Sequence, residues 1–250
     1  MEIIAHRGSS FIAPENTLAA IQLGWDEGAD AAESDFRLTR DGRIVSIHDA
    51  SMKRTAGVDW QVAEHTLAEL QTLDIGAWKG IQWAGQRIAT LEECLATTPP
   101  GKRFFVEIKS GVEIVPELVR AVRAAGQPLP QMALMSLSWD IVTTIRQALP
   151  DATVYHVTQF EWDKSANRWT PSTDEILAKA KQVGVNGLDL MGGGPLDAAM
   201  IARFAAAGLD RCAWTIDDPQ LARHLLSLGI TGITTNRPGW LRQQLENPAR

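Results

Sequence analysis

The chain of 250 residues carries 24 basic and 30 acidic side chains, and its formal net charge is −6. This length fits one large core, so residues 1–250 are expected to form a single domain. Neither sign of charge is gathered into a run, which excludes a nucleic-acid partner and predicts no stable association with a membrane surface. No stretch reaches the roughly 18 apolar residues that a membrane helix needs.

The start of the chain and its cysteines bear on location. The first residues, Met1 to Ile4, lead directly into an apolar run and lack the charged start and cleavage site of a secretory signal. Cys94 and Cys212 are not at metal-binding spacing and are expected to be free thiols. These features predict a cytoplasmic protein, and they leave a monomer and a homodimer both open.

The first predicted strand covers Ile3 to Ala5 and ends at His6-Arg7-Gly8. Glycine allows a sharp turn and a close approach of the backbone to a ligand, so the polar residues beside it are candidates for a site. A helix is predicted to begin near residue 14, where a proline suits the first turn, and to end between the glycines at 24 and 28.

The second predicted strand, residues 31–38, places Glu33 and Asp35 on one face because side chains alternate along a strand. Asp41-Gly42 follows and indicates a tight hairpin. If these two residues form the loop, the register sets His48 directly opposite Asp35, with about 4.5 to 5.5 Å between β-carbons. A longer turn with a bulge would change this register.

Residues 50–102 lack a regular βα pattern and are predicted to form an insertion over the barrel mouth, with helical pieces near 66–73 and 91–96. The next strand, residues 104–109, alternates so that Phe105, Glu107 and Lys109 share a face. Glu107 is therefore the third carboxylate expected to point inward.

From residue 112 onward, helical and extended segments alternate. Without the returning arm of the hairpin, the chain has eight predicted strands, which favours an α/β fold of the (β/α)8 TIM barrel type with a small insertion after the hairpin of the second strand. Active sites of such barrels lie at the C-terminal ends of the strands. Helices are predicted at 112–125, 139–149, 174–183, 197–207 and 219–228, and strands at 132–137, 153–157, 187–190, 211–216 and 232–235.

The three inward carboxylates, Glu33, Asp35 and Glu107, have no cysteine nearby. Oxygen ligands of this kind favour one hard divalent cation, Mg2+ or Ca2+, over zinc. Taken singly, each carboxylate could instead be solvated or paired with Arg7 or Lys109.

His6 and His48 flank these carboxylates and are candidates for proton transfer, because histidine titrates near neutral pH. Arg7 offers a two-pronged contact to phosphate and Lys109 a point charge, although both could simply balance the carboxylates. Trp214, at the end of a strand, is either a wall beside the substrate or a core residue.

Several other polar segments are expected to be structural. The remaining histidines, His65, His156 and His224, have no carboxylate cluster beside them. The glycines at 192–194 lack the lysine and spacing of a Walker loop and are expected to form a βα turn. Residues 161–169 are expected to form a long mixed loop.

The order and spacing of the motifs resemble the glycerophosphodiester phosphodiesterase family over nearly the whole chain. This resemblance implies a phosphatidylinositol-phospholipase-like barrel with an insertion after HD. It implies His6 and His48 as an acid/base pair, Glu33, Asp35 and Glu107 as metal ligands, and Arg7, Lys109 and Trp214 as substrate-side residues. The motifs are HRG at 6–8, PENT at 14–17, GAD at 28–30, ESD at 33–35, TRDG at 39–42, HD at 48–49, RT at 54–55, VEIK at 106–109, WT at 214–215 and TNRP at 235–238.

Two positions depart from the family pattern: Asn236 stands where the family often has aspartate, and Ala89 stands where it usually has proline. The implied reaction is hydrolysis of a small glycerophosphodiester, such as glycerophosphocholine or glycerophosphoethanolamine, to sn-glycerol 3-phosphate and an alcohol. Two alternatives remain: a lysophospholipase D or phosphoinositide-type phospholipase on the same barrel, and a non-catalytic barrel that binds phosphorylated ligands. The sequence shows no apolar anchor or basic patch for a membrane, which disfavours the lipid-directed enzymes.

Overall fold

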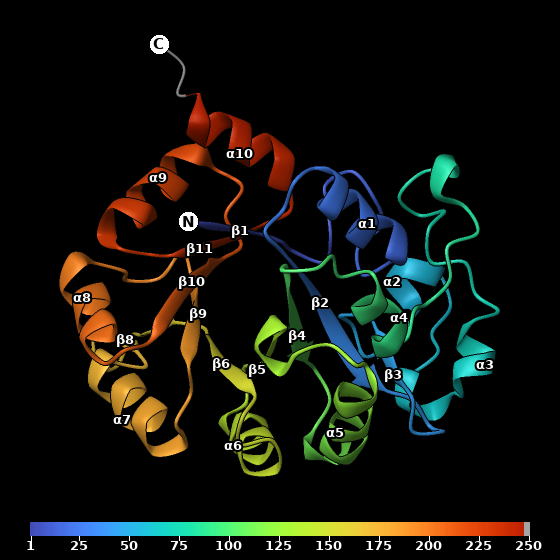
Figure 1. The fold of residues 1–250 in the computed structure, drawn as a ribbon, viewed down its shortest axis with the longest axis horizontal. Coiled ribbons are helices and arrows are strands. Elements are labelled where there is room, and N and C mark those ends of the chain that lie inside the picture. The colour runs from blue at the N-terminus through green and yellow to red at the C-terminus, as the bar shows by residue number, and fades with distance from the viewer. Residues whose placement is uncertain (248–250) are drawn as a thin grey trace.

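A closed ring of parallel strands forms the centre of the computed structural model, which describes residues 1–247 (Figure 1). The strands follow the order β1-β11-β10-β9-β6-β5-β4-β2, and pairing of β1 with β2 closes the ring. Within the described residues, the eight predicted barrel strands and the (β/α)8 fold are confirmed. These strands are β1 (Glu2–Ala5), β2 (Ala31–Leu38), β4 (Arg103–Ile108), β5 (Met132–Ser136), β6 (Thr153–Thr158), β9 (Gly187–Met191), β10 (Asp210–Trp214) and β11 (Gly232–Thr235).

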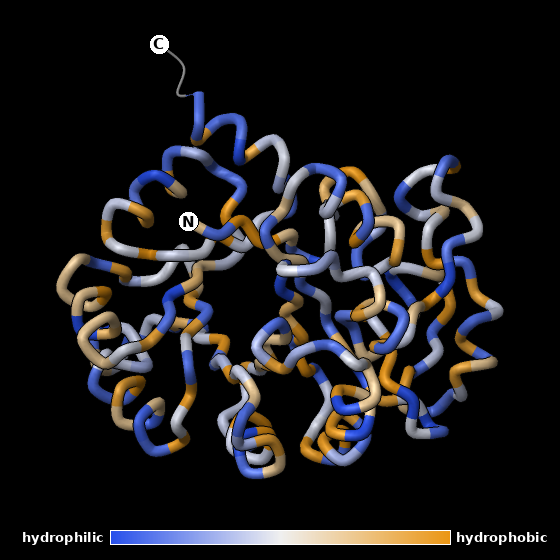
Figure 2. Tube along the Cα trace, in the orientation of Figure 1, coloured by the Kyte–Doolittle hydropathy of each residue, from blue (hydrophilic) through white to orange (hydrophobic). Residues whose placement is uncertain are grey.

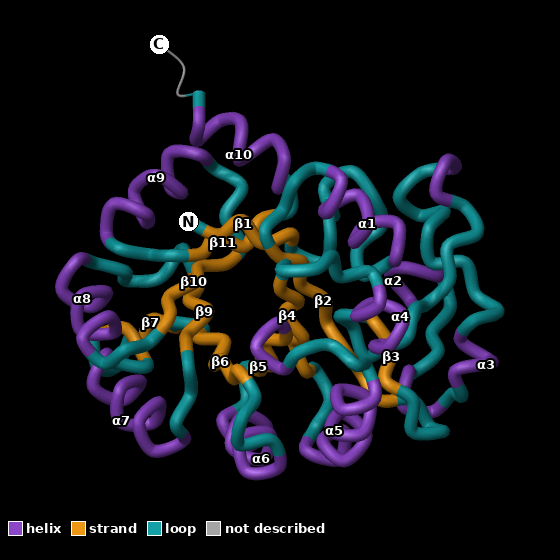
Figure 3. The backbone as a smooth tube through the Cα atoms, in the orientation of Figure 1, coloured by secondary structure: helices purple, strands orange, loops and turns teal. Residues whose placement is uncertain are grey.

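Helices surround this ring on the outside (Figure 3). The last of them, α10, was not predicted from the sequence, and its buried residues are Pro238 and Leu241. The outer helices are α1 (Leu18–Asp26), α5 (Val115–Ala124), α6 (Trp139–Ala148), α7 (Thr173–Val183), α8 (Ala198–Ala206), α9 (Pro219–Leu228) and α10 (Pro238–Glu246), with short 3-10 turns η3 (Val112–Ile114) and η4 (Leu129–Gln131).

Alternation along the strands separates two apolar regions. Phe104 and Val106 of β4 point outward and pack in the large core between strands and helices, whereas Phe105 packs inside the barrel with Tyr155. Figure 2 shows the matching alternation of hydrophobic and hydrophilic residues around the outer helices. Because Phe105 points inward, Glu107 two residues later also points into the barrel, as predicted.

The insertion forms a small core of its own beside β3 (Ile44–Ser46). Val45, Met52, Leu70 and Ile88 are among the buried residues that form it. Its helical pieces are α2 (Lys53–Ala56), η1 (Val62–Glu64), α3 (Leu67–Leu70), η2 (Ile81–Trp83) and α4 (Leu91–Ala96). A second departure from prediction lies after β6, where β7 (Glu161–Asp163) and β8 (Arg168–Thr170) form a hairpin in place of an irregular loop.

The hairpin between β2 and β3 has a different register from the predicted one. Leu38 pairs with Ile44, and the Thr39 backbone N–H donates to the carbonyl oxygen of Arg43 at 2.9 Å, so the loop has three residues. Gly42 takes the left-handed conformation (φ 73°) that such a loop requires. The prediction that His48 lies opposite Asp35 is therefore wrong by one residue.

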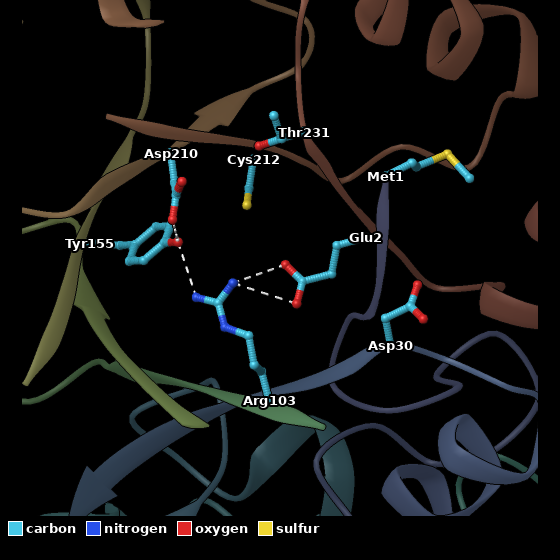
Figure 4. A pocket seen from close by; sticks show the side chains of 8 residues that line it. All are labelled: Met1, Glu2, Asp30, Arg103, Tyr155, Asp210, Cys212 and Thr231. Carbon is cyan, nitrogen blue, oxygen red and sulfur yellow. Dashed lines mark hydrogen bonds and ion pairs between the residues drawn. The ribbon is translucent and has the colours of Figure 1, made fainter. Parts of the chain in front are cut away.

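A network around Arg103 closes the barrel at the N-terminal ends of the strands (Figure 4). Arg103 donates to Glu2 Oε2 at 3.1 Å and to Tyr155 Oη at 3.0 Å, and Tyr155 donates to Asp210 Oδ2 at 2.6 Å. These side chains line a cavity of about 360 Å3. Polar residues at this end of a (β/α)8 barrel generally serve stability, so we place no chemistry there.

Two further sequence predictions concern membranes and cysteines. Among residues 1–247, none of the helices has both the length and the apolar character to cross a bilayer. Cys94 and Cys212 are buried free thiols, as expected.

Gly8 supports a test of the βα turn that carries the first motif. It has φ +78°, and an added Cβ would collide with the Ala20 backbone of α1. We expect Gly8→Ala to lower the free energy of unfolding by at least twice as much as Gly28→Ala. Gly28 is the control because it has a similar φ of +82°, but an added Cβ there would meet nothing within 4 Å among the described residues. Gly28→Ala therefore measures the backbone strain alone, which costs about 1–2 kcal/mol. Urea unfolding of both variants measures this, and equal losses would contradict the close packing of Gly8.

Candidate active site

Three carboxylates meet inside the barrel. Glu33 and Asp35 lie on β2, and Glu107 lies on β4, where it pairs directly with Asp35. One oxygen of each lies within 4.8 Å of the others, and all three side chains are buried. The structure thus brings together the three acidic residues that strand alternation predicted.

Arg7 and Lys109 oppose this negative charge. Arg7 Nε lies 3.0 Å from Asp35 Oδ2, and the Arg7 backbone N–H donates to Glu33 Oε2 at 2.8 Å. Lys109 Nζ lies 3.2 Å from Asp35 Oδ1 and 2.5 Å from Glu107 Oε1. Within the described part of the chain, Glu33 Oε1 is buried and has no hydrogen-bond partner. Two cations therefore face three carboxylates.

The pKa values follow this imbalance. Burial, together with repulsion from Asp35, raises the pKa of Glu33 well above its usual value and that of Glu107 to about 7. Burial also acts to raise the pKa of Asp35, but the nearby charges of Lys109 and Arg7 outweigh it and lower that pKa. The ionised form of Asp35 is therefore favoured in the site, whereas ionising Glu33 and Glu107 costs free energy.

Unusual backbone conformations shape the turn before α1. Arg7 and Asn16 have φ values of 54° and 60°, a region that asparagine tolerates better than most residues. Asn16 Nδ2 donates to Asp35 Oδ2 at 2.9 Å, and Asn16 Oδ1 accepts from the Asp35 backbone N–H at 3.0 Å. In the sequence, residues 14–17 indicated only a helix start, and this role of Asn16 was not predicted.

A chain of ion pairs connects His48 to Arg7 of the site, whereas the hairpin register does not place His48 opposite Asp35. Glu15 bridges two arginines: its Oε1 lies 2.8 Å from Arg7 Nη1, and its Oε2 lies 2.7 Å from Arg54 Nη1. Arg54 Nε in turn lies 2.7 Å from Asp49 Oδ2. Asp49 Oδ1 in turn lies 2.8 Å from His48 Nδ1. Its hydrogen bond to Arg54 lowers the pKa of Asp49 to about 2, so this carboxylate is charged and orients the His48 ring. Glu15 was not singled out in the sequence.

His6 lies at the end of β1 and contacts Asn236, which follows β11. The distance from His6 Nδ1 to Asn236 Oδ1 is 2.7 Å. Burial, reinforced by the charge of Arg7, lowers the pKa of His6 to about 4, so its ring is neutral near pH 7. A neutral imidazole with one bonded nitrogen has its other nitrogen available to accept a proton.

Trp214 and Asp189 extend the interior of the barrel. Trp214 Nε1 donates to the backbone oxygen of Asp189 at 3.1 Å, and its ring packs against the interior apolar cluster. Asp189 is buried, and its Oδ1 has no hydrogen-bond partner among residues 1–247. Asp189 was not predicted as a site residue, although its alternation with the outward Leu188 and Leu190 is enough to place an acid inside the barrel.

His156 is structural, as expected. Its ring stacks on Trp139 with 3.7 Å between centroids, and its nitrogens lie 3.0 Å from Thr158 Oγ1 and 3.1 Å from the Leu137 carbonyl oxygen. Both of its nitrogens are therefore occupied.

Comparisons with known proteins agree on one family. The model of the glycerophosphoryl diester phosphodiesterase family matches residues 6–240. YhdW of Bacillus subtilis is 33% identical over 249 residues, or 96% of each chain. A glycerophosphodiester phosphodiesterase of the same organism is 27% identical over 256 residues and covers 94% of this chain and 83% of the relative. A phosphodiesterase from Oleispira antarctica, solved in complex with the product sn-glycerol-3-phosphate, gives a TM-score of 0.86 at 27% identity and covers 98% of this chain and 97% of its own.

Glu107 predicts a pH-dependent stability of the metal-free protein. Its pKa is about 7 when folded and near 4.5 when unfolded, so its contribution to stability is complete below about pH 4.5 and is lost as the pH rises through about 7. We expect the free energy of unfolding, measured in chelator, to fall between about pH 5 and about pH 8. Glu107→Gln should reduce that fall by on the order of 2–3 kcal/mol.

The matched control for this prediction is Glu64→Gln, which alters an exposed carboxylate in η1. It should leave the pH dependence unchanged. An identical pH profile for Glu107→Gln and the wild type would contradict the assigned repulsion.

Proposed function

Because the chain belongs to the glycerophosphoryl diester phosphodiesterase family, we propose that it hydrolyses small glycerophosphodiesters to sn-glycerol 3-phosphate and an alcohol. Glycerophosphocholine and glycerophosphoethanolamine are the proposed substrates. The observation that carries this proposal is the convergence of Glu33, Asp35 and Glu107 beside Arg7 and Lys109. The product bound by the Oleispira antarctica relative supports the proposed product.

The proposed cofactor is one divalent cation, Mg2+ or Ca2+, held by Glu33, Asp35 and Glu107. The unpartnered Glu33 Oε1 and the surplus of negative charge fit this cation, and the all-oxygen ligand set fits a hard ion. When bound, such an ion supplies charge neutralisation at the phosphodiester and a lower pKa for a hydroxyl or water beside it.

Two cationic side chains and two histidines complete the proposed mechanism. Arg7 and Lys109 bind the non-bridging phosphate oxygens, and Trp214 forms an apolar wall beside the substrate. His6, which is neutral near pH 7, takes the proton of the glycerol 2-hydroxyl as that oxygen attacks phosphorus. His48 gives a proton to the departing alcohol, which leaves a cyclic phosphate.

Ring opening then reverses the two histidine roles. His48, now without its proton, takes one from the attacking water. His6 returns its proton to the 2-oxygen, and the product is sn-glycerol 3-phosphate.

Alanine variants of the two histidines test these roles. We expect His6→Ala and His48→Ala each to lower kcat on glycerophosphocholine by roughly 10²–10⁴, because each removes one proton transfer. Choline release measures this turnover. His224→Ala, on the exposed side of α9, is the control and should retain wild-type activity. Wild-type rates in either site variant would reject the assignment.

Lysophospholipids are a second candidate substrate class, favoured by an apolar patch beside the site. Phe11 and Ile12 are 56% and 51% exposed, and with Arg237 and Trp240 they line a cavity of about 210 Å3. They directly follow Ser10, whose hydroxyl lies 2.7 Å from the His6 carbonyl oxygen. Such a patch could hold an acyl chain, and it was not anticipated from the sequence.

The double variant Phe11→Ser/Ile12→Ser separates the two substrate classes. We expect kcat/KM for lysophosphatidylcholine to fall at least about tenfold, since burying even one large apolar side chain contributes about 1.5–3 kcal/mol, while kcat/KM for glycerophosphocholine stays unchanged. Ile81→Ser, in the insertion, is the matched control because Ile81 is 85% exposed. No cleavage of lysophosphatidylcholine by the wild type, or equal losses on both substrates, would remove this candidate.

A further inference from the structure

Asn236 and Asp217 form a hydrogen-bonded chain behind His6. Asn236 Oδ1 lies 2.7 Å from His6 Nδ1, and Asn236 Nδ2 donates to Asp217 Oδ2 at 2.6 Å. Asp217 Oδ1 accepts from the Asn236 backbone N–H at 2.8 Å and from Thr235 Oγ1 at 2.7 Å. The chain joins the segments that follow β10, β11 and β1, all at the C-terminal end of the barrel.

The chemistry of these groups fixes the direction of each hydrogen bond. An ionised carboxylate only accepts, so the amide nitrogen of Asn236 must face Asp217 and its amide oxygen must face His6. An amide oxygen also only accepts, so the proton of this contact belongs to His6 Nδ1. A neutral imidazole carries one N–H, which leaves Nε2 with a free electron pair.

Ser10 does not decide the orientation of the amide. Its Oγ lies 2.8 Å from Asn236 Oδ1 and 2.7 Å from the His6 carbonyl oxygen, and its single hydroxyl proton can be donated to only one of them. The contact with Asp217 fixes the orientation. A reversed Asn236 side chain would place two N–H donors against His6 and an amide oxygen against the Asp217 carboxylate. That arrangement would leave the carboxylate facing another acceptor.

We propose that Asn236 and Asp217 are positioning residues that hold His6 in the tautomer with a proton on Nδ1 and a free Nε2. Asp217 acts through Asn236, because its charge sets which way the amide points. The consequence for the reaction rests on the proposed role of His6 as a proton acceptor. The tautomer itself does not depend on that role, since it follows from the hydrogen bonds alone.

Nitrogen NMR of 15N-histidine-labelled protein tests the tautomer directly. Near pH 7 the wild type should give a protonated Nδ1 and an unprotonated Nε2 signal for His6, assigned by their loss in His6→Ala. A wild-type ring protonated on Nε2 would overturn the proposal. Because no substrate is involved, this result stands apart from any failure of the phosphodiesterase assignment.

Exchanging the two polar groups tests how the tautomer is set. In Asp217→Asn the amide of Asn236 is no longer held in one direction, so kcat on glycerophosphocholine should fall about 10- to 100-fold, part of the roughly 10²–10⁴ that a general base supplies, with KM within about twofold. The double variant Asp217→Asn/Asn236→Asp places a carboxylate against His6 Nδ1 and an amide behind it. Its kcat should be at least about tenfold higher than that of Asp217→Asn, and it should give the wild-type tautomer signals.

Melting temperatures separate positioning from folding. If the Asp217–Asn236 hydrogen bonds only stabilise the fold, kcat of Asp217→Asn should follow the folded fraction, and the tautomer signals of the folded protein should be unchanged. That result would overturn the proposal. Wild-type kcat in Asp217→Asn, or no regain in the double variant when it is fully folded, would also overturn it. If either variant fails to fold, the nitrogen NMR spectrum of the wild type is the test, and a His6 ring protonated on Nε2 overturns the proposal.

Discussion

An unbalanced cluster of charges inside the barrel is the constraint on which the site depends. Glu33, Asp35 and Glu107 lie within 4.8 Å of one another and face two cations, Arg7 and Lys109. Burial and mutual repulsion raise the pKa of two of these carboxylates, so their ionisation costs free energy that a bound divalent cation would offset. Sites of this kind are places where a chain gives up stability for chemistry.

The barrel makes this cluster possible because neighbouring parallel strands end at the same face. β2 and β4 align Asp35 with Glu107, while the turn after β1 carries His6 and aims the Arg7 backbone at Glu33. Around this centre, surrounding segments hold the two histidines by different means. An ion-pair chain through Glu15, Arg54 and Asp49 orients His48, and an uncharged amide backed by Asp217 orients His6.

Local periodicity predicted most of the fold and the positions of the acidic residues. Alternation along residues 31–38 and 104–109 was enough to turn Glu33, Asp35 and Glu107 inward, because strand parity does not depend on partners far away in the chain. The hairpin register was wrong for a tertiary reason: Asp41 Oδ1 accepts from Thr39 Oγ1 and from the Leu67 backbone N–H of α3, which favours the longer loop. Asn16 and Asp217 were missed because Asp35 lies 19 positions from Asn16 and Thr235 lies 18 positions from Asp217. Glu15 was missed because it joins Arg7, 8 positions away, to Arg54, 39 positions away. No short sequence pattern marks such contacts. Asp189 is different, since alternation alone could have found it.

Calorimetric titration of the chelator-stripped protein with Mg2+ and with Ca2+ tests directly whether Glu33, Asp35 and Glu107 bind one hard cation. We expect saturable binding of one ion per chain, with an affinity that weakens as the pH falls below about 7, where Glu107 gains a proton. Binding should be abolished in Glu33→Gln. The absence of saturable binding of either ion to the wild type, or equal binding to Glu33→Gln, would contradict this assignment.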